Sequence, residues 1–366
     1  MRPVTEAELA EAVRGAAGPL RILGGGTRGV GRPGPGAVLE TGGLAGISLY
    51  EPGALTLVAQ AGTPLAEVEA MLAAEGQRLP FEVPDMRGLL GTQGVSTLGG
   101  VVAANASGPR RLQAGACRDS LIGVRLVTGE GVVIRNGGRV MKNVTGYDLV
   151  KLMAGSWGTL GVLTEVSFKL LPVPEAAATL VLHGLPDARA VAAMAAAMGS
   201  PFEVSGAAHW PGQGTFLRIE GFAASVAYRA GRLAALLAGF GAVEREDGAA
   251  RWAGIRDVAP FHGREGDVWR LSVKPSEAAG IAARLGAEAV LYDWAGGLIW
   301  ALMAPGIDLR ARLGPFGGHA TLLRAGPDTR ARLAAFHPEP APLAALAAGL
   351  RAKFDPRGIL NPGLMV

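Results

Sequence analysis

Apolar residues in the first half of the chain fall in short runs that glycine and proline interrupt. Runs of this length are typical of buried strands, and the longer periodic stretches that follow helix-start signals are typical of helices. The predicted strands lie at residues 20–23, 37–40, 55–61, 124–128, 132–135 and 161–171. The predicted helices lie at residues 5–14, 64–76 and 148–154.

Two of these helices have recognisable starts. Thr5 and Glu8 form a T-x-x-E capping box, and Pro64 is expected at the first helical position after Thr63. Gly76 is the expected stop of the second helix.

Pro172 and Pro174 interrupt the chain after the last of these strands, and we place the main domain boundary there. Beyond it, helices are predicted at residues 188–198, 225–237 and 343–354, and strands at residues 216–219, 268–273 and 298–303. Two helices interleaved with an antiparallel sheet predict a compact α+β cap domain. The length of 366 residues suits two domains. No internal repeat is visible.

The first glycine-rich loop follows the strand at residues 20–23. Gly24, Gly26 and Gly29 satisfy G-x-G-x-x-G, but a Rossmann site needs a helix to begin in this loop, and the prolines and glycines of residues 30–37 forbid one. Successive glycines can instead turn several backbone N–H groups toward an anion. Thr27 adds a hydroxyl and Arg28 a charge. The alternative interpretation is a tight strand–strand turn.

The second such segment, residues 91–108, is dominated by small residues. Glycines interrupt every period, so we expect neither a good core helix nor a strand there. A featureless loop of this length is unusual in a compact domain. Small side chains allow the backbone to approach a large flat ligand, and Thr97, Asn105 and Ser107 offer hydrogen bonds. Two such segments beside strands favour a long diphosphate cofactor.

Composition and charge reduce the number of function classes that the chain can belong to. Hydrophobic residues make up 49% of the chain and charged residues 18%, which suits a large core. The net charge of +4 is spread over scattered arginines with few aromatic residues, so we expect an anionic substrate or acidic partner and no nucleic acid. No apolar run is long enough to span a bilayer, and early glutamates argue against a signal peptide. A cytoplasmic location is expected, with any contact to the inner membrane made through partners.

Cysteine and histidine usage limits redox and metal chemistry. Cys117 is the single cysteine, which excludes an internal disulfide and a cysteine-ligated iron–sulfur cluster in this chain. The five histidines form neither H-x-H nor H-E-x-x-H, so no metal site is expected. Electron transfer through iron–sulfur chemistry would need another subunit.

Four segments carry a family resemblance: GGGTRG, STLGGVVAANASGPRR, KNVTGYDLVKLMAGSWGTLGVLTEVSFKLLP and FDPRGILNPG. In this order they resemble the vanillyl-alcohol-oxidase-type flavoproteins with a PCMH-type FAD-binding domain. Among these, the chain is most similar to the smaller flavoprotein subunits of glycolate oxidase. The resemblance implies a two-subdomain FAD-binding domain, a ferredoxin-like α+β cap and a C-terminal segment that returns to the first domain, at residues 1–173, 174–340 and 341–366.

The resemblance also assigns cofactor residues. The first loop would hold the pyrophosphate of FAD, through Gly24, Gly25, Gly26, Thr27, Arg28 and Gly29. The second segment would supply Thr97, Gly99, Gly100, Asn105, Ser107 and Gly108. Val162 matches a position whose backbone meets the adenine side, and Asn361 one near the isoalloxazine. Related proteins with covalent flavin often have a histidine in the first loop, whereas this chain has Thr27, so noncovalent FAD is expected.

The catalytic residues are less specified. Relatives that oxidise 2-hydroxy acids directly commonly carry an H-x-H metal pair and a further histidine, and this chain has neither arrangement. His319, next to two glycines, is the first candidate for a general base, and His262 is the second. Tyr147 and Lys151 lie four residues apart, and we assign them a structural role.

The predicted function is that of the FAD-binding subunit of a complex that oxidises glycolate to glyoxylate. Its partners would be the larger flavoprotein subunit and an iron–sulfur subunit, which receives the electrons. The alternatives are a stand-alone dehydrogenase of another hydroxy acid or alcohol, and a non-catalytic FAD-binding assembly subunit.

Overall fold

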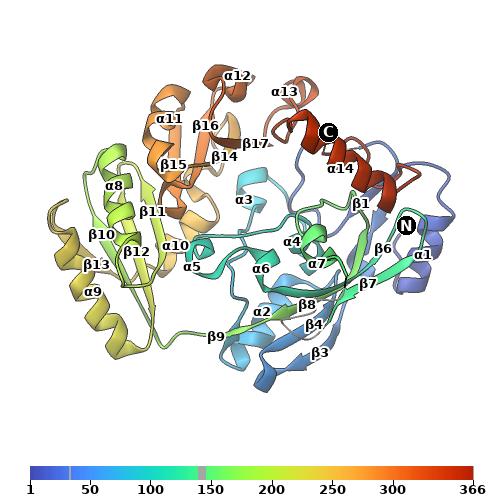
Figure 1. Ribbon diagram of the computed structural model, residues 1–366, viewed down its shortest axis with the longest axis horizontal. Helices are drawn as coiled ribbons and strands as arrows, with labels where there is room; N and C mark the ends of the chain where they lie inside the picture. Colours follow the sequence, from blue (N-terminus) through green and yellow to red (C-terminus); the bar gives the residue numbers. More distant parts are fainter. Residues whose placement is uncertain (33, 139–145, 366) are drawn as a thin grey trace.

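Two antiparallel sheets lie side by side in the computed structural model, which describes residues 1–32, 34–138 and 146–365 (Figure 1). A five-stranded sheet belongs to the first half of the chain and an eight-stranded sheet to the second half. Lys142–Thr145 of the KNVTGYDL segment lie outside the described residues. No helix among the described residues is both long and apolar enough to cross a membrane.

The five-stranded sheet has the order β3-β4-β8-β6-β7, and each pair is antiparallel. Its strands are β3 (Ile47–Glu51), β4 (Thr56–Gln60), β6 (Leu121–Val127), β7 (Val133–Gly137) and β8 (Val162–Lys169). The helices whose buried residues complete its core are α2 (Leu65–Ala74), α4 (Leu98–Ala103) and α7 (Leu149–Met153). Short elements connect these parts: β5 (Gln77–Arg78), β9 (Leu171–Pro172), α3 (Arg87–Leu90), α5 (Arg111–Ala114) and α6 (Cys117–Ser120).

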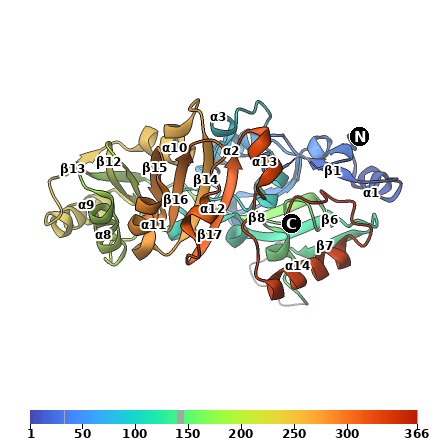
Figure 2. The same cartoon turned by 90° about the horizontal axis from the view of Figure 1, so that it is seen from above.

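The two ends of the chain meet beside this sheet. β1 (Leu20–Leu23) pairs in parallel with β2 (Ala37–Glu40), and α1 (Glu6–Arg14) packs against the pair. The Leu20 N–H donates to the Ile359 carbonyl at 2.7 Å, and the Asn361 N–H donates to the Leu20 carbonyl at 3.0 Å. The segment that follows α14 (Ala341–Phe354) is therefore bonded to the strand that leads into the first glycine loop (Figures 1 and 2).

The eight-stranded sheet consists of two units with the same topology. Each unit runs β-α-β-β-α-β, the ferredoxin-like order. The first unit is β10 (Ala176–Leu182), α8 (Asp187–Met198), β11 (Val204–Trp210), β12 (Gly214–Gly221), α9 (Ala223–Leu237) and β13 (Val243–Glu246). The second is β14 (Asp267–Val273), α11 (Ala278–Leu285), β15 (Ala289–Asp293), β16 (Leu298–Met303), α12 (Leu309–Leu313) and β17 (Gly318–Arg324). The sheet order β13-β10-β12-β11-β15-β16-β14-β17 joins the units through β11 and β15.

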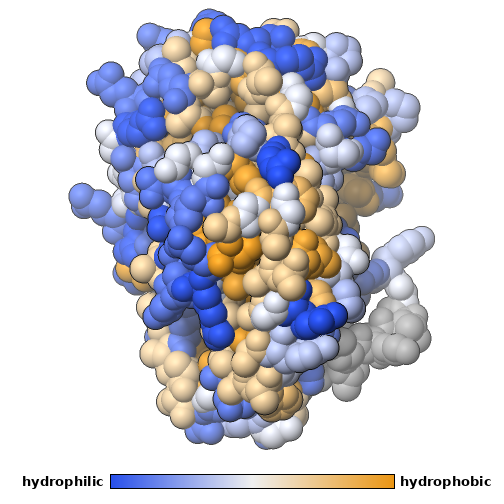
Figure 3. Space-filling view, turned by 90° about the vertical axis from the view of Figure 1, so that its left-hand side faces the viewer, coloured by the Kyte–Doolittle hydropathy of each residue, from blue (hydrophilic) through white to orange (hydrophobic). Residues whose placement is uncertain are grey.

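The helices of the cap cover one side of the eight-stranded sheet, and the end of the cap near α9 is exposed. Buried residues of α8, α9 and α11 share one hydrophobic core with it, while α10 (Ala249–Arg256) lies between the units in the chain and α13 (Pro327–Arg332) follows them. Figure 3 views the cap end and shows apolar surface beside hydrophilic side chains. Phe222, Tyr228 and Leu236, at the start of α9 and along it, are exposed apolar residues.

Buried ion pairs hold the first half of the chain against β12. Arg110 pairs with Glu220, and Arg218 pairs with Glu82 at 2.8 Å. Arg78 also reaches Glu220, at 2.9 Å. Removing one partner from such a network leaves an uncompensated buried charge, which is strongly destabilising. The network therefore fixes how the cap sits over the first half.

The α+β class and the antiparallel cap predicted from the sequence are confirmed, with several corrections. The cap has eight strands and more helices than the two predicted, and the repeat of its topology has no visible counterpart in the sequence. Pro64 is the N-cap residue of α2 and not its first helical residue. The Thr5 hydroxyl accepts from the Glu8 N–H, but the Glu8 carboxylate accepts from Val4, so the capping box is only half formed. The domain boundaries at 173 and 340 stay a prediction.

The prediction that residues 91–108 contain no core helix is wrong. α4 begins after Thr97, whose hydroxyl accepts from the Gly100 N–H at 3.3 Å. Leu98, Val101 and Val102 are fully buried, at helical spacing. Burial of this apolar face outweighs the poor helix propensity of the glycines, because tertiary packing supplies most of the stability of a short helix.

Candidate functional site

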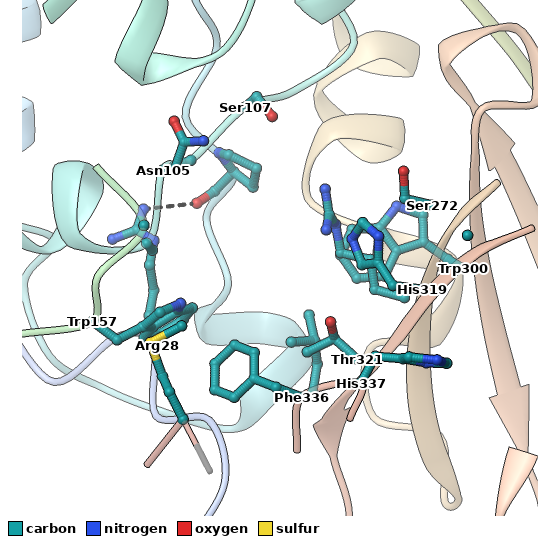
Figure 4. A pocket seen from close by; sticks show the side chains of 18 of the residues that line it. Arg28, Asn105, Ser107, Trp157, Ser272, Trp300, His319, Thr321, Phe336 and His337 are labelled. Atoms are coloured by element: carbon teal, nitrogen blue, oxygen red, sulfur yellow. Dashed lines mark hydrogen bonds between the residues drawn. The ribbon is translucent and has the colours of Figure 1, made fainter. Parts of the chain in front are cut away.

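A cavity of about 630 Å³ lies between the first half of the chain and the cap. We call it the cap cavity. Figure 4 shows Arg28 and Trp157 on one side of it and Ser272, Trp300 and His319 on the other. A second cavity of about 130 Å³, the loop cavity, lies beside the glycine-rich segments.

The first glycine loop borders both cavities and presents free backbone donors. Gly24 lines the loop cavity and Arg28 the cap cavity. Among the described residues, no hydrogen bond joins a backbone N–H of residues 25–29 to a protein acceptor. Gly26 has φ +70°, and a Cβ on Gly26 or Gly29 would meet only open space. Consecutive N–H groups without protein acceptors, beside open space, suit a bound anion such as a diphosphate.

The Arg28 side chain leaves the first loop and is hydrogen-bonded to the second glycine-rich segment and to the chain before it. Its guanidinium donates to the Ser96 hydroxyl at 2.7 Å. It also donates to the Pro84 carbonyl at 3.1 Å, the bond that is dashed in Figure 4. Burial lowers its pKa, which Asp85 partly offsets, yet an arginine remains charged at neutral pH. The loop therefore combines N–H donors with a fixed positive charge.

The second segment contributes shape more than hydrogen bonds. The Gly99 N–H donates to the Ala61 carbonyl at 2.6 Å, and the Gly100 N–H is taken by Thr97. A Cβ on Gly99 would lie 2.9 Å from the Ala61 carbonyl O. Gly99 and Gly100 line the loop cavity, whereas Thr97 lines neither cavity. The small residues thus allow close approach of a ligand. Thr97 was expected to offer its hydroxyl to a ligand, but that hydroxyl caps the N-terminus of α4.

The later residues of this segment face the cap. Asn105 and Ser107 line the cap cavity, where the Ser107 hydroxyl accepts from Arg111 at 3.0 Å. Gly108 lines neither cavity. Its carbonyl accepts from the indole N–H of Trp294 at 3.1 Å, so this glycine joins the segment to the turn between β15 and β16.

The two remaining predicted cofactor positions differ in what they present. Val162 is buried in the core at 1% exposure, but its neighbours Gly161 and Leu163 line the loop cavity. Asn361 lines that cavity directly, and its side chain accepts from the Ile22 N–H at 2.7 Å and donates to the Trp157 carbonyl at 2.8 Å. The C-terminal segment therefore closes one side of the loop cavity.

The first half of the chain and the cap together form a cationic wall, through Arg111 of α5 and Arg270 of β14. The guanidinium carbons of Arg111 and Arg270 lie 4.6 Å and 5.1 Å from the ring centroid of Trp294. Burial lowers the pKa of Arg270 to about 10, so it stays protonated at neutral pH. The charged residues that line the cavity are Arg28, Arg111, Arg270 and Glu339. This excess of positive charge attracts an anion.

Of the two histidine candidates, the structure brings only His319 to the cavity. Burial lowers its pKa, and Arg270, His337 and Arg111 lower it further, so the imidazole is neutral at pH 7. His262 lines neither cavity; a ring nitrogen lies 2.8 Å from the Asp257 carbonyl, and its ring fills the space beside Gly88. Lys151 donates to the Leu121 carbonyl at 3.0 Å, whereas Tyr147 is 90% exposed.

Four of the eight described non-glycine residues with positive φ line at least one of the two cavities. Asn105, Trp157, Trp294 and Asn361 have φ between +42° and +52°, which non-glycine residues adopt at a cost in free energy. Sequence reasoning missed Arg111, Arg270, Trp157 and Trp294. The only signal for them was a tryptophan inside a glycine-rich run, as in GSWG.

Comparisons with known proteins agree with this geometry. Residues 1–137 match the family model of an FAD binding domain. Glycolate oxidase subunit GlcE of Escherichia coli (strain K12) is 38% identical over 350 residues, which cover 95% of this chain and 92% of that protein. Glycolate oxidase subunit GlcD of Bacillus subtilis (strain 168) is 38% identical over 127 residues, 35% of this chain and 26% of its own length.

A solved structure of alkyldihydroxyacetonephosphate synthase has the same fold. It superposes with a TM-score of 0.72 at 17% identity, covering 99% of this chain and 76% of its own. The near full-length match to GlcE, together with the FAD binding domain, decides the relationship: the chain belongs to the family of glycolate oxidase GlcE subunits.

Proposed function

We propose that this chain binds FAD noncovalently and that its cap cavity receives a 2-hydroxy acid, glycolate, as one subunit of a glycolate-oxidising complex. The observation that carries the proposal is the row of N–H groups at residues 25–29, which have no protein acceptor among the described residues and belong to a loop whose Arg28 lines a cavity of about 630 Å³ with a cationic wall. Membership of the GlcE family supports the choice of substrate.

The cofactor fits the residues present. The N–H groups of the first loop would hold the pyrophosphate, with Gly99, Gly100 and Asn361 beside one half of the molecule. The loop has Thr27 and no histidine, so it offers no imidazole for covalent attachment. When bound, FAD supplies a two-electron acceptor, which oxidation of a CH–OH group requires.

The residues that line the cap cavity have separate tasks in this proposal. Arg270 and Arg111 would bind the carboxylate of the substrate through charge-assisted hydrogen bonds. His319 would accept the hydroxyl proton, and its lowered pKa keeps a ring nitrogen free to do so at pH 7. Loss of that proton and of a hydride from carbon converts glycolate to glyoxylate. The hydride's two electrons are what the cofactor accepts.

Onward electron transfer requires partners. Cys117, the single cysteine of the chain, is fully buried, and burial raises its pKa, so it is an unreactive core residue. We propose that an iron–sulfur subunit receives the electrons and that the larger flavoprotein subunit completes the complex. Cytoplasmic location, with contact to the inner membrane through these partners, belongs to the same proposal.

The absorbance spectrum of the purified chain tests the proposal first. We expect a yellow protein whose flavin leaves the polypeptide in acid as unmodified FAD. Glycolate added anaerobically to the assembled complex should bleach the flavin absorbance. A colourless chain, flavin retained on the denatured polypeptide, or FMN in the released fraction would contradict the cofactor assignment. Full activity of the isolated chain with a soluble acceptor would favour a stand-alone dehydrogenase.

A further inference from the structure

Trp157 forms the wall between the two cavities. It lines both the cap cavity and the loop cavity, and it is the one described residue that the two linings share. Its ring lies edge-on to Phe336, with centroids 5.7 Å apart and planes 65° apart. Figure 4 shows the indole beside Phe336 at the edge of the open space.

The backbone of Trp157 is held in an unfavourable conformation by two other parts of the chain, α4 and the C-terminal segment. Its φ is +51°, its N–H donates to the Ala103 carbonyl at 3.0 Å, and its carbonyl accepts from Asn361 at 2.8 Å. Gly158 follows with φ +72°, and a Cβ there would lie 2.9 Å from the Asn361 side-chain nitrogen. Strain of this kind persists where the surroundings over-determine it, and it gathers at ligand sites.

The position of Trp157 between the two cavities can be related to the first glycine loop, which also borders both. Gly24 borders the loop cavity and Arg28 the cap cavity, with the free N–H groups between them. The pyrophosphate of FAD lies between its adenosine and its flavin halves. A pyrophosphate on this loop therefore sends one half toward each cavity. The flavin is the half that needs the larger, aromatic-lined space.

We propose that Trp157 contacts the flavin half of bound FAD and fixes its position against the cap cavity. The inference rests on the function proposed above and adds a positioning residue to it. Core packing alone does not account for Trp157, because its ring is only half-buried and faces the open cavity. A flat aromatic surface at that place suits a flat aromatic ligand.

Separate titrations with FAD and ADP test the contact. ADP carries the adenosine and the two phosphates but no flavin, so the loss of a ring contact with the flavin raises the Kd for FAD and not the Kd for ADP. The full-length chain, freed of FAD, is titrated calorimetrically with each ligand as wild type, Trp157→Leu and Trp157→Phe. Trp210→Leu is the matched control, since Trp210 is also half-buried but lines neither cavity.

The expected result is selective. Trp157→Leu should raise the Kd for FAD about tenfold, or about 1.4 kcal/mol, and change the Kd for ADP by less than about twofold. Trp157→Phe keeps a flat ring, so its affinity for FAD should fall less than that of Trp157→Leu. It provides the same comparison of FAD with ADP if the leucine variant does not fold. An unchanged Kd for FAD, or a parallel rise for FAD and ADP, would overturn the proposal. A wild-type chain that binds neither ligand would refute the proposed function itself.

Discussion

Gly25 is held so tightly against the second glycine-rich segment that a single added methyl group should separate the two loops. A Cβ on Gly25 would lie 1.3 Å from the carbonyl O of Val95 and 2.5 Å from its C. A Cβ on Gly94 would likewise lie 1.6 Å from the Gly25 carbonyl O. All of these are backbone atoms, so no change of rotamer relieves the overlap. The two loops are in backbone contact here.

The same loop provides two matched controls. Gly26→Ala meets open space but has to adopt φ +70°. Gly29→Ala meets open space and has no left-handed φ. The three substitutions add the same methyl group, so they separate backbone collision from conformational strain and from mere change of residue.

The structure ranks their effects. Ordinary van der Waals contact begins near 3.4 Å, so Gly25→Ala requires a backbone displacement of about 2 Å. Overpacking costs about 1–3 kcal/mol where side chains can shift, and a collision between backbones should reach at least the upper end of that range. Gly26→Ala should cost about 1–2 kcal/mol through its left-handed conformation. Gly29→Ala should be neutral, or stabilising by about 0.4–1 kcal/mol through the unfolded state.

Urea unfolding of the FAD-free variants measures these free energies, and FAD titration of each variant measures the functional effect. Gly25→Ala should also weaken FAD binding, because it displaces the row of N–H groups. A free energy of unfolding for Gly25→Ala within about 1 kcal/mol of that for Gly29→Ala would refute the reasoning.

Three further predictions concern the cap cavity and Asp293, which precedes Trp294 in its wall. His319→Ala should lower the rate of glycolate oxidation by the complex about 10²–10⁴-fold with FAD content unchanged, whereas loss of FAD or of stability instead would show a structural histidine. Arg270→Gln should raise KM for glycolate, whereas Arg284→Gln, on the exposed side of α11, should leave KM unchanged. Arg270→Gln also removes a positive neighbour of His319, so the pKa of His319 should rise and the acid limb of the pH–rate profile should move to higher pH. Burial raises the pKa of Asp293 to about 7 from 3.8, so the folded state keeps a proton that the unfolded state releases and stability falls as pH rises from about 4 to about 7. Asp293→Asn should remove that loss, which is at most about 4 kcal/mol, and unfolding at pH 5 and pH 8 would check it.

The glycine loops could be predicted from the sequence because their signal is local. The residues of GGGTRG, and the prolines and glycines after it, predict a turn that no helix follows, and this prediction needs no knowledge of the rest of the fold. The same local reasoning failed for α4, where the apolar face of Leu98, Val101 and Val102 is buried by distant parts of the chain. The propensity of glycine was a poor guide there because packing decided the outcome.

The cationic wall could not be predicted in this way. Arg111 and Arg270 are far apart in the chain and meet through Trp294, which lies in the turn between β15 and β16. Their meeting depends on which strands pair and on how the cap sits over the first half. Neither is encoded in the spacing of any one segment. His319 was found because histidines are few and this one follows two glycines.

The two halves of the cap share a topology but serve the site differently. The first unit places Arg218 and Glu220 of β12 in the buried ion pairs with the first half of the chain. The second unit turns β14 and β17 toward the cavity, where Arg270 pairs across the strands with Thr321, and both line the cavity. Because β11 and β15 join the units in one sheet, the anchoring of the first unit also orients the second. Substitutions in the ion pairs of β12 should therefore disturb the cavity without touching it, and substitutions on β14 should change the cavity while leaving the anchor intact.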